Sequence, residues 1–221
     1  MKGSYALPKP DFRLIAISDD IRTPGDSEAS LVEDTIELAV AYAASGIRAF
    51  QLRKKSWSDR AIFRAVNALS REASDFDLAV LVNERADIAQ LTLADGLHLP
   101  EHGLPLSDAR RIYTNGLIGK SCHSIEAAVK AKKDGTDYII FGPVYETESK
   151  KQYGPPLGIE MFRDVCKKVK VPVFAVGGID PIRAEECLNA GAHGVAVMSA
   201  LTDNDKFWDN LNGFESALGE L

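Results

Sequence analysis

Short apolar segments rich in β-branched residues alternate along the chain with longer segments in which apolar residues recur every three or four positions. The first pair is Phe12–Ser18, which predicts a strand, and Leu31–Ala43, which predicts a helix that ends near Gly46. The alternation continues to a last helical pattern at about residues 205–218. It predicts about eight consecutive β-then-α units.

The strand pattern predicts how these units are arranged. Strands are expected at residues 12–18, 47–52, 78–83, 95–99, 117–121, 138–142, 171–178 and 193–199. The nearly continuous apolar run at 78–83 is typical of a parallel strand that is buried on both faces. Eight such units predict an α/β fold, the (β/α)8 TIM barrel, as a single domain over residues 1–221. The alternative is a doubly wound open sheet, but no GxGxxG motif follows the first strand.

Cations gather where the second predicted strand ends. A TIM barrel places its chemistry at the carboxyl ends of its strands. The two-residue period of a strand turns Gln51, Arg53 and Lys55 to one side. Two cations on one side can clamp an anion, and Lys150 in the long segment 142–158 can close on the same anion. The alternative interpretation is a solvated basic turn.

Glycines and a serine follow the last two predicted strands. Gly177 and Gly178 come after the seventh strand and Ser199 after the eighth. Barrels often bind a phosphate there through backbone N–H groups that a side chain would obstruct. The alternative is that the two glycines only form a tight turn.

His123 is the titratable side chain that is best placed for acid–base chemistry. It follows the fifth predicted strand, and a histidine at the barrel mouth can move protons near neutral pH. The alternative is a histidine that caps a helix or fills space. Neighbouring residues in an extended chain point apart, so a Cys122–His123 nucleophilic pair is not expected. His98, inside a strand pattern, is expected to pack in the core.

Composition excludes several classes of protein. There are 26 Lys and Arg against 32 Asp and Glu, a net charge of −6, which argues against nucleic-acid binding by bulk charge. No apolar run approaches the roughly 20 residues of a membrane span, so no membrane partner is expected. The three cysteines form no CxxC pair, so neither a disulfide framework nor a zinc cluster is expected. A cytoplasmic location is expected.

Motifs at successive strand ends resemble one known family. The segments QLRKK (51–55), NER (83–85), IGKSCHS (118–124), ETESKK (146–151), VGGI (176–179) and GVAVMSA (194–200) are similar to those of the thiamine phosphate synthase/TenI family. The resemblance covers nearly the whole chain. It implies a TIM barrel and a role in thiamine biosynthesis, with a phosphorylated thiazole as the small-molecule substrate. Pairs of barrels are common in the family, so a homodimer is one assembly that the resemblance suggests.

The resemblance implies one of two activities, and the first is thiamine phosphate synthesis. A synthase joins hydroxymethylpyrimidine diphosphate to thiazole phosphate, with Mg²⁺ on two aspartates. Here those positions carry Glu84 and Gly103, so Glu84 is a metal ligand only for a synthase. The resemblance gives the diphosphate to Gln51, Arg53, Lys55, Asn83, Thr147, Ser149 and Lys150, and the thiazole phosphate to Gly177, Gly178 and Ser199.

The second activity is thiazole tautomerisation, an acid–base isomerisation that needs no metal. The segment that contains Ser121 and His123 is closer to this TenI-like branch, and the incomplete set of metal carboxylates favours it too. The leading expectation is therefore a tautomerase with His123 as its catalytic group, Ser121 beside the substrate and no cofactor. A synthase is the alternative. A non-catalytic regulator that binds thiazole or thiamine phosphates is a further one.

Overall fold

The computed structural model describes residues 9–18, 27–72, 75–147, 155–202, 205–219 and 221. In that part of the chain, eight strands alternate with eight α-helices. The strands are β1 (Leu14–Ile17), β2 (Ala49–Leu52), β3 (Ala79–Asn83), β4 (Gly96–Leu99), β5 (Leu117–Cys122), β6 (Tyr138–Phe141), β7 (Val173–Val176) and β8 (Gly194–Val197). The helices are α1 (Glu28–Ala44), α2 (Asp59–Glu72), α3 (Ala86–Thr92), α4 (Leu106–Ile112), α5 (Ile125–Asp134), α6 (Ile159–Lys168), α7 (Pro181–Asn189) and α8 (Phe207–Leu218).

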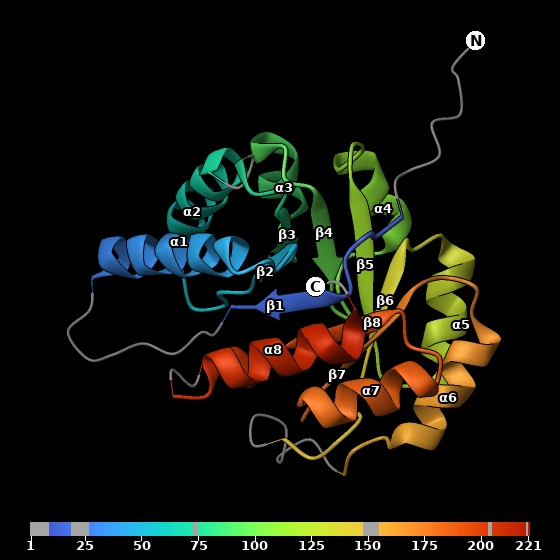
Figure 1. Cartoon of the computed structure of the whole chain (residues 1–221). Helices are drawn as coiled ribbons and strands as arrows, with labels where there is room; N and C mark the ends of the chain where they lie inside the picture. Colours follow the sequence, from blue (N-terminus) through green and yellow to red (C-terminus); the bar gives the residue numbers. More distant parts are fainter. Residues whose placement is uncertain (1–8, 19–26, 73–74, 148–154, 203–204, 220) are drawn as a thin grey trace.

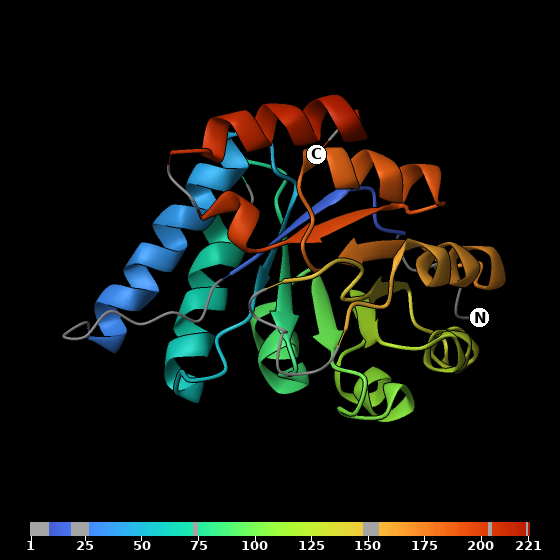
Figure 2. The same cartoon turned by 90° about the horizontal axis from the view of Figure 1, so that it is seen from below.

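The strands close into a barrel in chain order, surrounded by the helices (Figures 1 and 2). Every neighbouring pair is parallel, and β8 pairs back with β1 through Leu14 and Val195. The predicted TIM barrel is therefore confirmed. An open doubly wound sheet is excluded, because it would leave two edge strands without a partner.

The expected strand boundaries lie within a few residues of the observed ones. The largest difference is at 171–178, where the observed strand is only Val173–Val176. The strand ends early because Gly177 and Gly178 adopt φ values of +96° and +64°, which a strand does not have.

Alternation along each strand divides the core into two layers. On β1, Leu14 and Ala16 pack outward against the helices, whereas Ile15 fills the inside of the barrel. The inner cluster comprises Phe12, Ile15, Ala49, Leu81, Leu117, Tyr138, Ile140, Phe174 and Ala196. Further along β2 to β5, the inward positions become polar, at Gln51, Asn83, His98 and Ser121. The apolar core thus ends before the strands do and leaves a polar layer at their carboxyl ends.

Side-chain caps start several helices close to where the preceding strand ends. The hydroxyl of Ser124 accepts a hydrogen bond from Ala127 N at 3.1 Å, and Asp180 accepts one from Arg183 N at 2.8 Å. These caps fix the first turns of α5 and α7. Over the described residues, no helix has the length and apolarity needed to cross a membrane.

Candidate active site at the barrel mouth

A cavity of about 330 Å³ lies at the carboxyl ends of the strands. Ten of the residues that the sequence predicts for the site line it: Gln51, Arg53, Lys55, Asn83, Ser121, His123, Thr147, Gly177, Gly178 and Ser199. Glu84 is not among the lining residues. Ser149 and Lys150 lie outside the described residues. The cavity therefore brings together side chains and glycines from most of the strand ends that the sequence singles out.

The cationic side of the cavity follows β2. The backbone N–H of Arg53 donates to the hydroxyl of Ser18, at 2.7 Å, so the end of β1 fixes the backbone at this position. Lys54 turns the other way, and its ammonium lies 5.2 Å from the centre of the Trp57 ring. The two-residue period thus directs Arg53 and Lys55 to the cavity, although Lys55 also remains exposed to solvent.

The glycine side of the cavity follows β7. A Cβ atom on Gly178 would lie 2.4 Å from the carbonyl oxygen of Glu146, and one on Gly177 would lie 2.6 Å from Pro143. Only glycine fits at either position. The turn therefore packs directly against the β6–α6 segment and keeps its backbone open to the cavity.

His98 is a lining residue that the sequence analysis did not include in the site. It is 3% exposed, as expected for a core residue, yet its ring also faces the cavity. Its Nε2 lies 2.8 Å from the hydroxyl of Ser121. Burial, with help from the charges of Arg53 and Lys120, lowers the pKa of His98 to about 3. The imidazole is therefore neutral at physiological pH.

Two buried polar atoms in the cavity wall are unsatisfied. Among the described residues, Nε2 of Gln51 and Nδ1 of His98 have no hydrogen-bond partner. An unpaired buried polar atom is costly, and native proteins usually supply it with a partner. These two atoms are suited to contact a polar ligand.

His123 enters the cavity from the end of β5 with one ring nitrogen already engaged. Its Nδ1 contacts the carbonyl oxygen of Gly142, and because a carbonyl only accepts, the proton is assigned to Nδ1. The Nε2 atom of a neutral ring then carries the lone pair. The backbone N–H of His123 donates to the Glu101 carboxylate at 2.6 Å. His123 is thus held at two points and can exchange a proton through Nε2.

The cysteines are not arranged for nucleophilic chemistry. Cys122 is fully buried, and desolvation raises the pKa of its thiol to about 12. The thiolate is the reactive form. A Cys122–His123 nucleophilic pair therefore has no support in the geometry.

The described residues at this end of the barrel provide few carboxylate ligands for Mg²⁺. Within the described residues, no cluster of three or more His, Cys, Asp or Glu side chains is suited to hold a metal. Glu84 is exposed after β3, where it accepts a hydrogen bond from the Asn83 amide at 2.9 Å. Glu101 is engaged by His123. Mg²⁺ is commonly held by one or two carboxylates together with substrate phosphates. Glu84 is one carboxylate next to Asn83, which lines the cavity.

A second, larger cavity of about 460 Å³ lies at the amino ends of the strands. Its one arginine, Arg48, is already paired with Asp11 at 3.0 Å and Asp77 at 2.7 Å. TIM-barrel active sites lie at the opposite end. The smaller cavity at the mouth is therefore the candidate active site despite its size.

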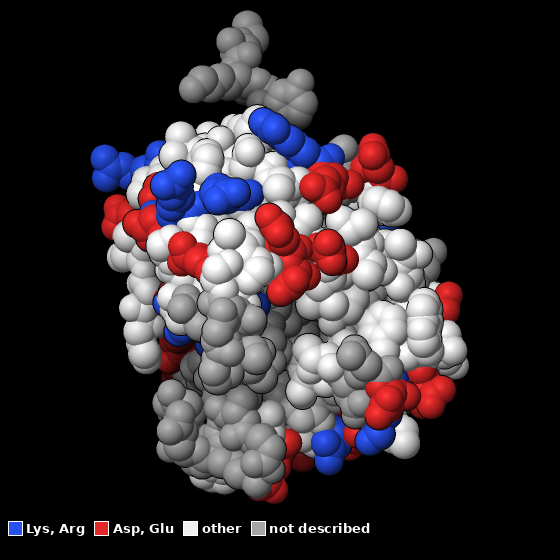
Figure 3. Space-filling view, turned by 90° about the vertical axis from the view of Figure 1, so that its left-hand side faces the viewer, with Lys and Arg blue, Asp and Glu red and all other residues white. Residues whose placement is uncertain are grey.

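One face of the molecule carries charged side chains of both signs. Figure 3 shows acidic and basic side chains in small separate groups on one side of the molecule. This agrees with the net charge of −6.

Comparisons with known proteins agree with the fold. The family described as thiamine monophosphate synthase (TMP-TENI) matches residues 21–201. A putative thiamine-phosphate synthase of Geobacter sulfurreducens is 40% identical over 88% of this chain and 89% of its own length. A thiamine-phosphate synthase of Methanocella arvoryzae is 38% identical over 76% and 80%. The solved thiamine phosphate pyrophosphorylase of Pyrococcus furiosus has a TM-score of 0.80 and 28% identity, over 94% of this chain and 96% of that one.

The fold and the cavity define a TIM-barrel protein whose mouth is lined by cationic side chains and glycines. The chain belongs to the thiamine phosphate synthase/TenI family of thiamine biosynthesis. The family expected from the strand-end motifs is thus confirmed. The relatives carry the names of synthases, which favours the transfer reaction over the leading expectation of a tautomerase.

Proposed function

We propose that the protein is a thiamine-phosphate synthase. The observation that carries the proposal is that one cavity has two separate groups of residues whose chemistry suits anion binding. Arg53, Lys55 and Asn83 come from β2 and β3, whereas the glycine turn and Ser199 follow β7 and β8. A transferase that joins a diphosphate ester to a phosphorylated acceptor needs two such groups. An isomerase that acts on one phosphorylated thiazole needs only one.

In the proposed reaction, the bond between the hydroxymethyl carbon and the diphosphate oxygen breaks. The electron pair leaves with the diphosphate, and the lone pair of the thiazole nitrogen forms the new C–N bond. Arg53 and Lys55 stabilise the negative charge that accumulates on the leaving group. The backbone at Gly177 and Gly178 and the hydroxyl of Ser199 hold the thiazole phosphate. Glu84 would be the residue to hold Mg²⁺, which would supply further charge neutralisation.

The test is synthesis from the two purified substrates with and without Mg²⁺. We expect Mg²⁺-dependent formation of thiamine phosphate, detected by mass spectrometry. Lys55→Met removes one charge-assisted contact to the diphosphate and is expected to lower kcat/KM about 10- to 100-fold. Lys133→Met, on an exposed residue at the end of α5, is the matched control and should leave kcat/KM unchanged. Absence of product from the wild-type protein would contradict the proposal.

Tautomerisation of a carboxythiazole phosphate is the second candidate, because His123 faces the cavity with its proton assigned to Nδ1. For this reaction, His123→Ala should abolish aromatisation and leave thiazole phosphate binding nearly unchanged. His102→Ala is the control, since the His102 side chain is 92% exposed. Tautomerase turnover without any thiamine phosphate synthesis would favour this candidate. Tight binding with neither reaction would indicate a regulator.

A further inference from the structure

Two neighbouring loops must hold their positions if one diphosphate is to be bound by residues from both. The β2–α2 loop carries Arg53 and Lys55, and Asn83 is the last residue of β3, where the β3–α3 loop begins. Loops at strand ends are the more mobile parts of a barrel. The two loops therefore need a connection between them that does not use the substrate.

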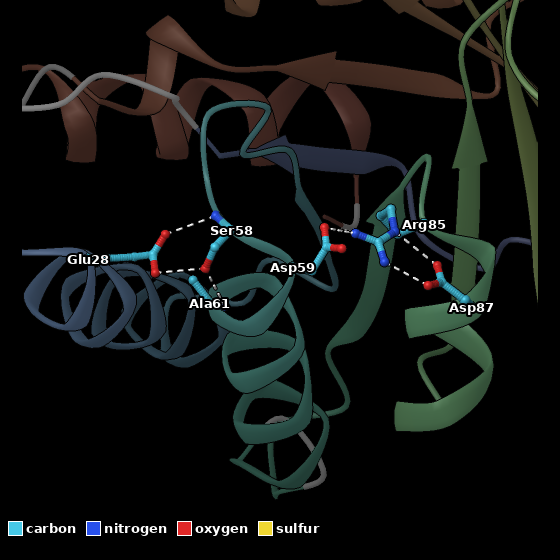
Figure 4. Close-up of polar contacts among 6 residues, drawn as sticks. All are labelled: Glu28, Ser58, Asp59, Ala61, Arg85 and Asp87. Carbon is cyan, nitrogen blue, oxygen red and sulfur yellow. Dashed lines mark hydrogen bonds and ion pairs between the residues drawn. The ribbon is translucent and has the colours of Figure 1, made fainter.

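Arg85 makes that connection (Figure 4). Its Nε and Nη2 donate to the two carboxylate oxygens of Asp87 at 2.9 and 2.6 Å, while its Nη1 contacts the carboxylate of Asp59. Asp59 is the first residue of α2 and lies four positions after Lys55. One guanidinium thus joins the end of the β2–α2 loop to the start of α3.

The backbone next to Arg85 is held in a conformation that needs support. Glu84 has a φ of +64°, a left-handed conformation that is unfavourable for a residue with a side chain. The N–H of Glu84 donates to the carbonyl of His98 at 2.8 Å, and the N–H of Arg85 donates to the carbonyl of Asn83 at 2.8 Å. This tight turn sets where the Asn83 side chain enters the cavity. Fixing the Arg85 side chain fixes the far end of the turn.

A second contact restrains the β2–α2 loop from the other side. Glu28, the first residue of α1, accepts hydrogen bonds from the N–H and the hydroxyl of Ser58, at 2.8 and 2.7 Å. The same hydroxyl accepts the N–H of Ala61 at 3.2 Å (Figure 4). The residues just before and at the start of α2 are therefore held by α1 on one side and by Arg85 on the other.

The charge on Arg85 is already used by protein carboxylates. Two aspartates surround the guanidinium, and Arg85 is absent from the residues that line the cavity. A guanidinium shared by two carboxylates is a poor ligand for a further anion. Its effect on a diphosphate has to be indirect.

We propose that Arg85 is a positioning residue for the diphosphate half of the site, through the bridge from Asp87 on α3 to Asp59 on α2. This rests on the proposed function only for the identity of the substrate. The bridge holds the β2–α2 and β3–α3 loops in the relative position in which Arg53, Lys55 and Asn83 face the same cavity. The glycine side, after β7, is independent of it.

The test uses Arg85→Lys, which keeps the charge but loses the planar fork that reaches two carboxylates. The probe is inorganic pyrophosphate with Mg²⁺, measured by calorimetry. We expect about tenfold weaker binding, because misplaced groups lose much of their interaction. In turnover, the KM for the pyrimidine diphosphate should rise by about the same factor, with the KM for thiazole phosphate unchanged. Wild-type pyrophosphate affinity in folded Arg85→Lys, or an equal rise in both KM values, would overturn the proposal.

Arg110→Lys is the matched control. Arg110 donates to the carbonyl of Gly116 at 2.8 Å and contacts Asp137, at the amino ends of the strands. Its loss should lower the melting temperature but leave pyrophosphate binding unchanged. Equal weakening by both variants would reduce Arg85 to a general structural role and overturn the proposal.

Asp59→Asn tests the same bridge if Arg85→Lys does not fold. It removes one carboxylate of the bridge and leaves Arg85 paired with Asp87. It should also weaken pyrophosphate binding, and wild-type affinity would overturn the proposal. Because this probe needs no turnover, a wild-type protein that makes no thiamine phosphate contradicts the proposed function and leaves the positioning result standing.

Discussion

Tyr138 shows how one residue can be packed without being fully satisfied. Its ring lies inside the barrel, edge-on to Phe174 at 5.7 Å, and a Cβ on Gly119 would lie 2.0 Å from it. Within the described residues, its buried hydroxyl has no hydrogen-bond partner. The ring therefore contributes packing, whereas the hydroxyl contributes a desolvation cost.

We expect Tyr138→Phe to raise the free energy of unfolding by up to about 1 kcal/mol, because it removes an unpaired polar group. Gly119→Ala should lower it by about 1–3 kcal/mol, since the new methyl group overlaps the ring. Urea denaturation measures both values. A loss of more than 1 kcal/mol in Tyr138→Phe would mean that the hydroxyl has a partner, such as a buried water.

At the same scale, the sequence predicts which way a side chain points but not how deep it lies. Alternation places Gln51, Arg53 and Lys55 on one side, and all three line the cavity. The same alternation sends His98 into the barrel, where it was expected to be core. An inward residue belongs to the apolar core or lines the cavity, depending on how far along the barrel the apolar core extends. The large Tyr138 side chain, on another strand, helps to set where that core ends.

The β7–α7 turn and the β6–α6 segment form one unit at the scale of elements. The N–H of Tyr145 donates to the carbonyl of Gly177 at 3.1 Å, and Nη1 of Arg183 on α7 donates to the carbonyl of Gly178 at 2.6 Å. The guanidinium of Arg183 also lies 4.8 Å from the centre of the Tyr145 ring. The glycine turn is therefore held from both sides.

Gly178→Ala should raise the KM for thiazole phosphate at least about tenfold, because the methyl group forces the turn away from the Glu146 carbonyl. Pyrophosphate affinity should not change, since Arg53 and Lys55 lie on other loops. Gly135→Ala is the control, as Gly135 also has a positive φ, +92°, but ends α5. Gly135→Ala should lower the free energy of unfolding and leave both KM values unchanged. Steady-state kinetics with each substrate varied in turn measures both KM values. A rise in the KM for the pyrimidine diphosphate in Gly178→Ala would contradict the prediction.

Element order was predictable from the sequence, whereas contacts between loops were not. Periodicity predicts strands and helices because each buries a regular face. The Tyr145–Arg183 and Arg85–Asp59 contacts join residues 38 and 26 positions apart (183 − 145 and 85 − 59), and each joins a loop residue to the first turn of a helix. Local sequence periodicity does not predict such contacts, so only the three-dimensional structure identifies them.

For the whole molecule, the first and last helices complete the ring around the barrel. The Tyr42 ring of α1 stacks on Phe207 of α8 at 5.7 Å, and its hydroxyl donates to the carbonyl of Leu201 at 2.9 Å. This contact joins elements more than 150 residues apart, as the separation of 159 between Tyr42 and Leu201 shows.

Tyr42→Ala should lower the free energy of unfolding by about 3–5 kcal/mol, as for other buried aromatic residues. Tyr42→Phe keeps the ring and should cost about 1 kcal/mol for the lost hydrogen bond. Ile182→Ala, at a residue that is 82% exposed, should stay within about 0.5 kcal/mol of the wild type. Chemical denaturation measures these free energies. If Tyr42→Ala lowered the free energy of unfolding no more than Ile182→Ala, the stack would not stabilise the fold.

The parallel pairing of β1 with β8 also has a consequence for synthesis in the cell. Leu14 is among the first core residues made, yet its partner Val195 emerges from the ribosome only after about 180 further residues (195 − 14 = 181). Until then β1 has an unpaired edge that can associate with other chains. The nascent chain can form local β–α units early, but the closed ring, and with it the complete mouth, is acquired only after β8 has been made.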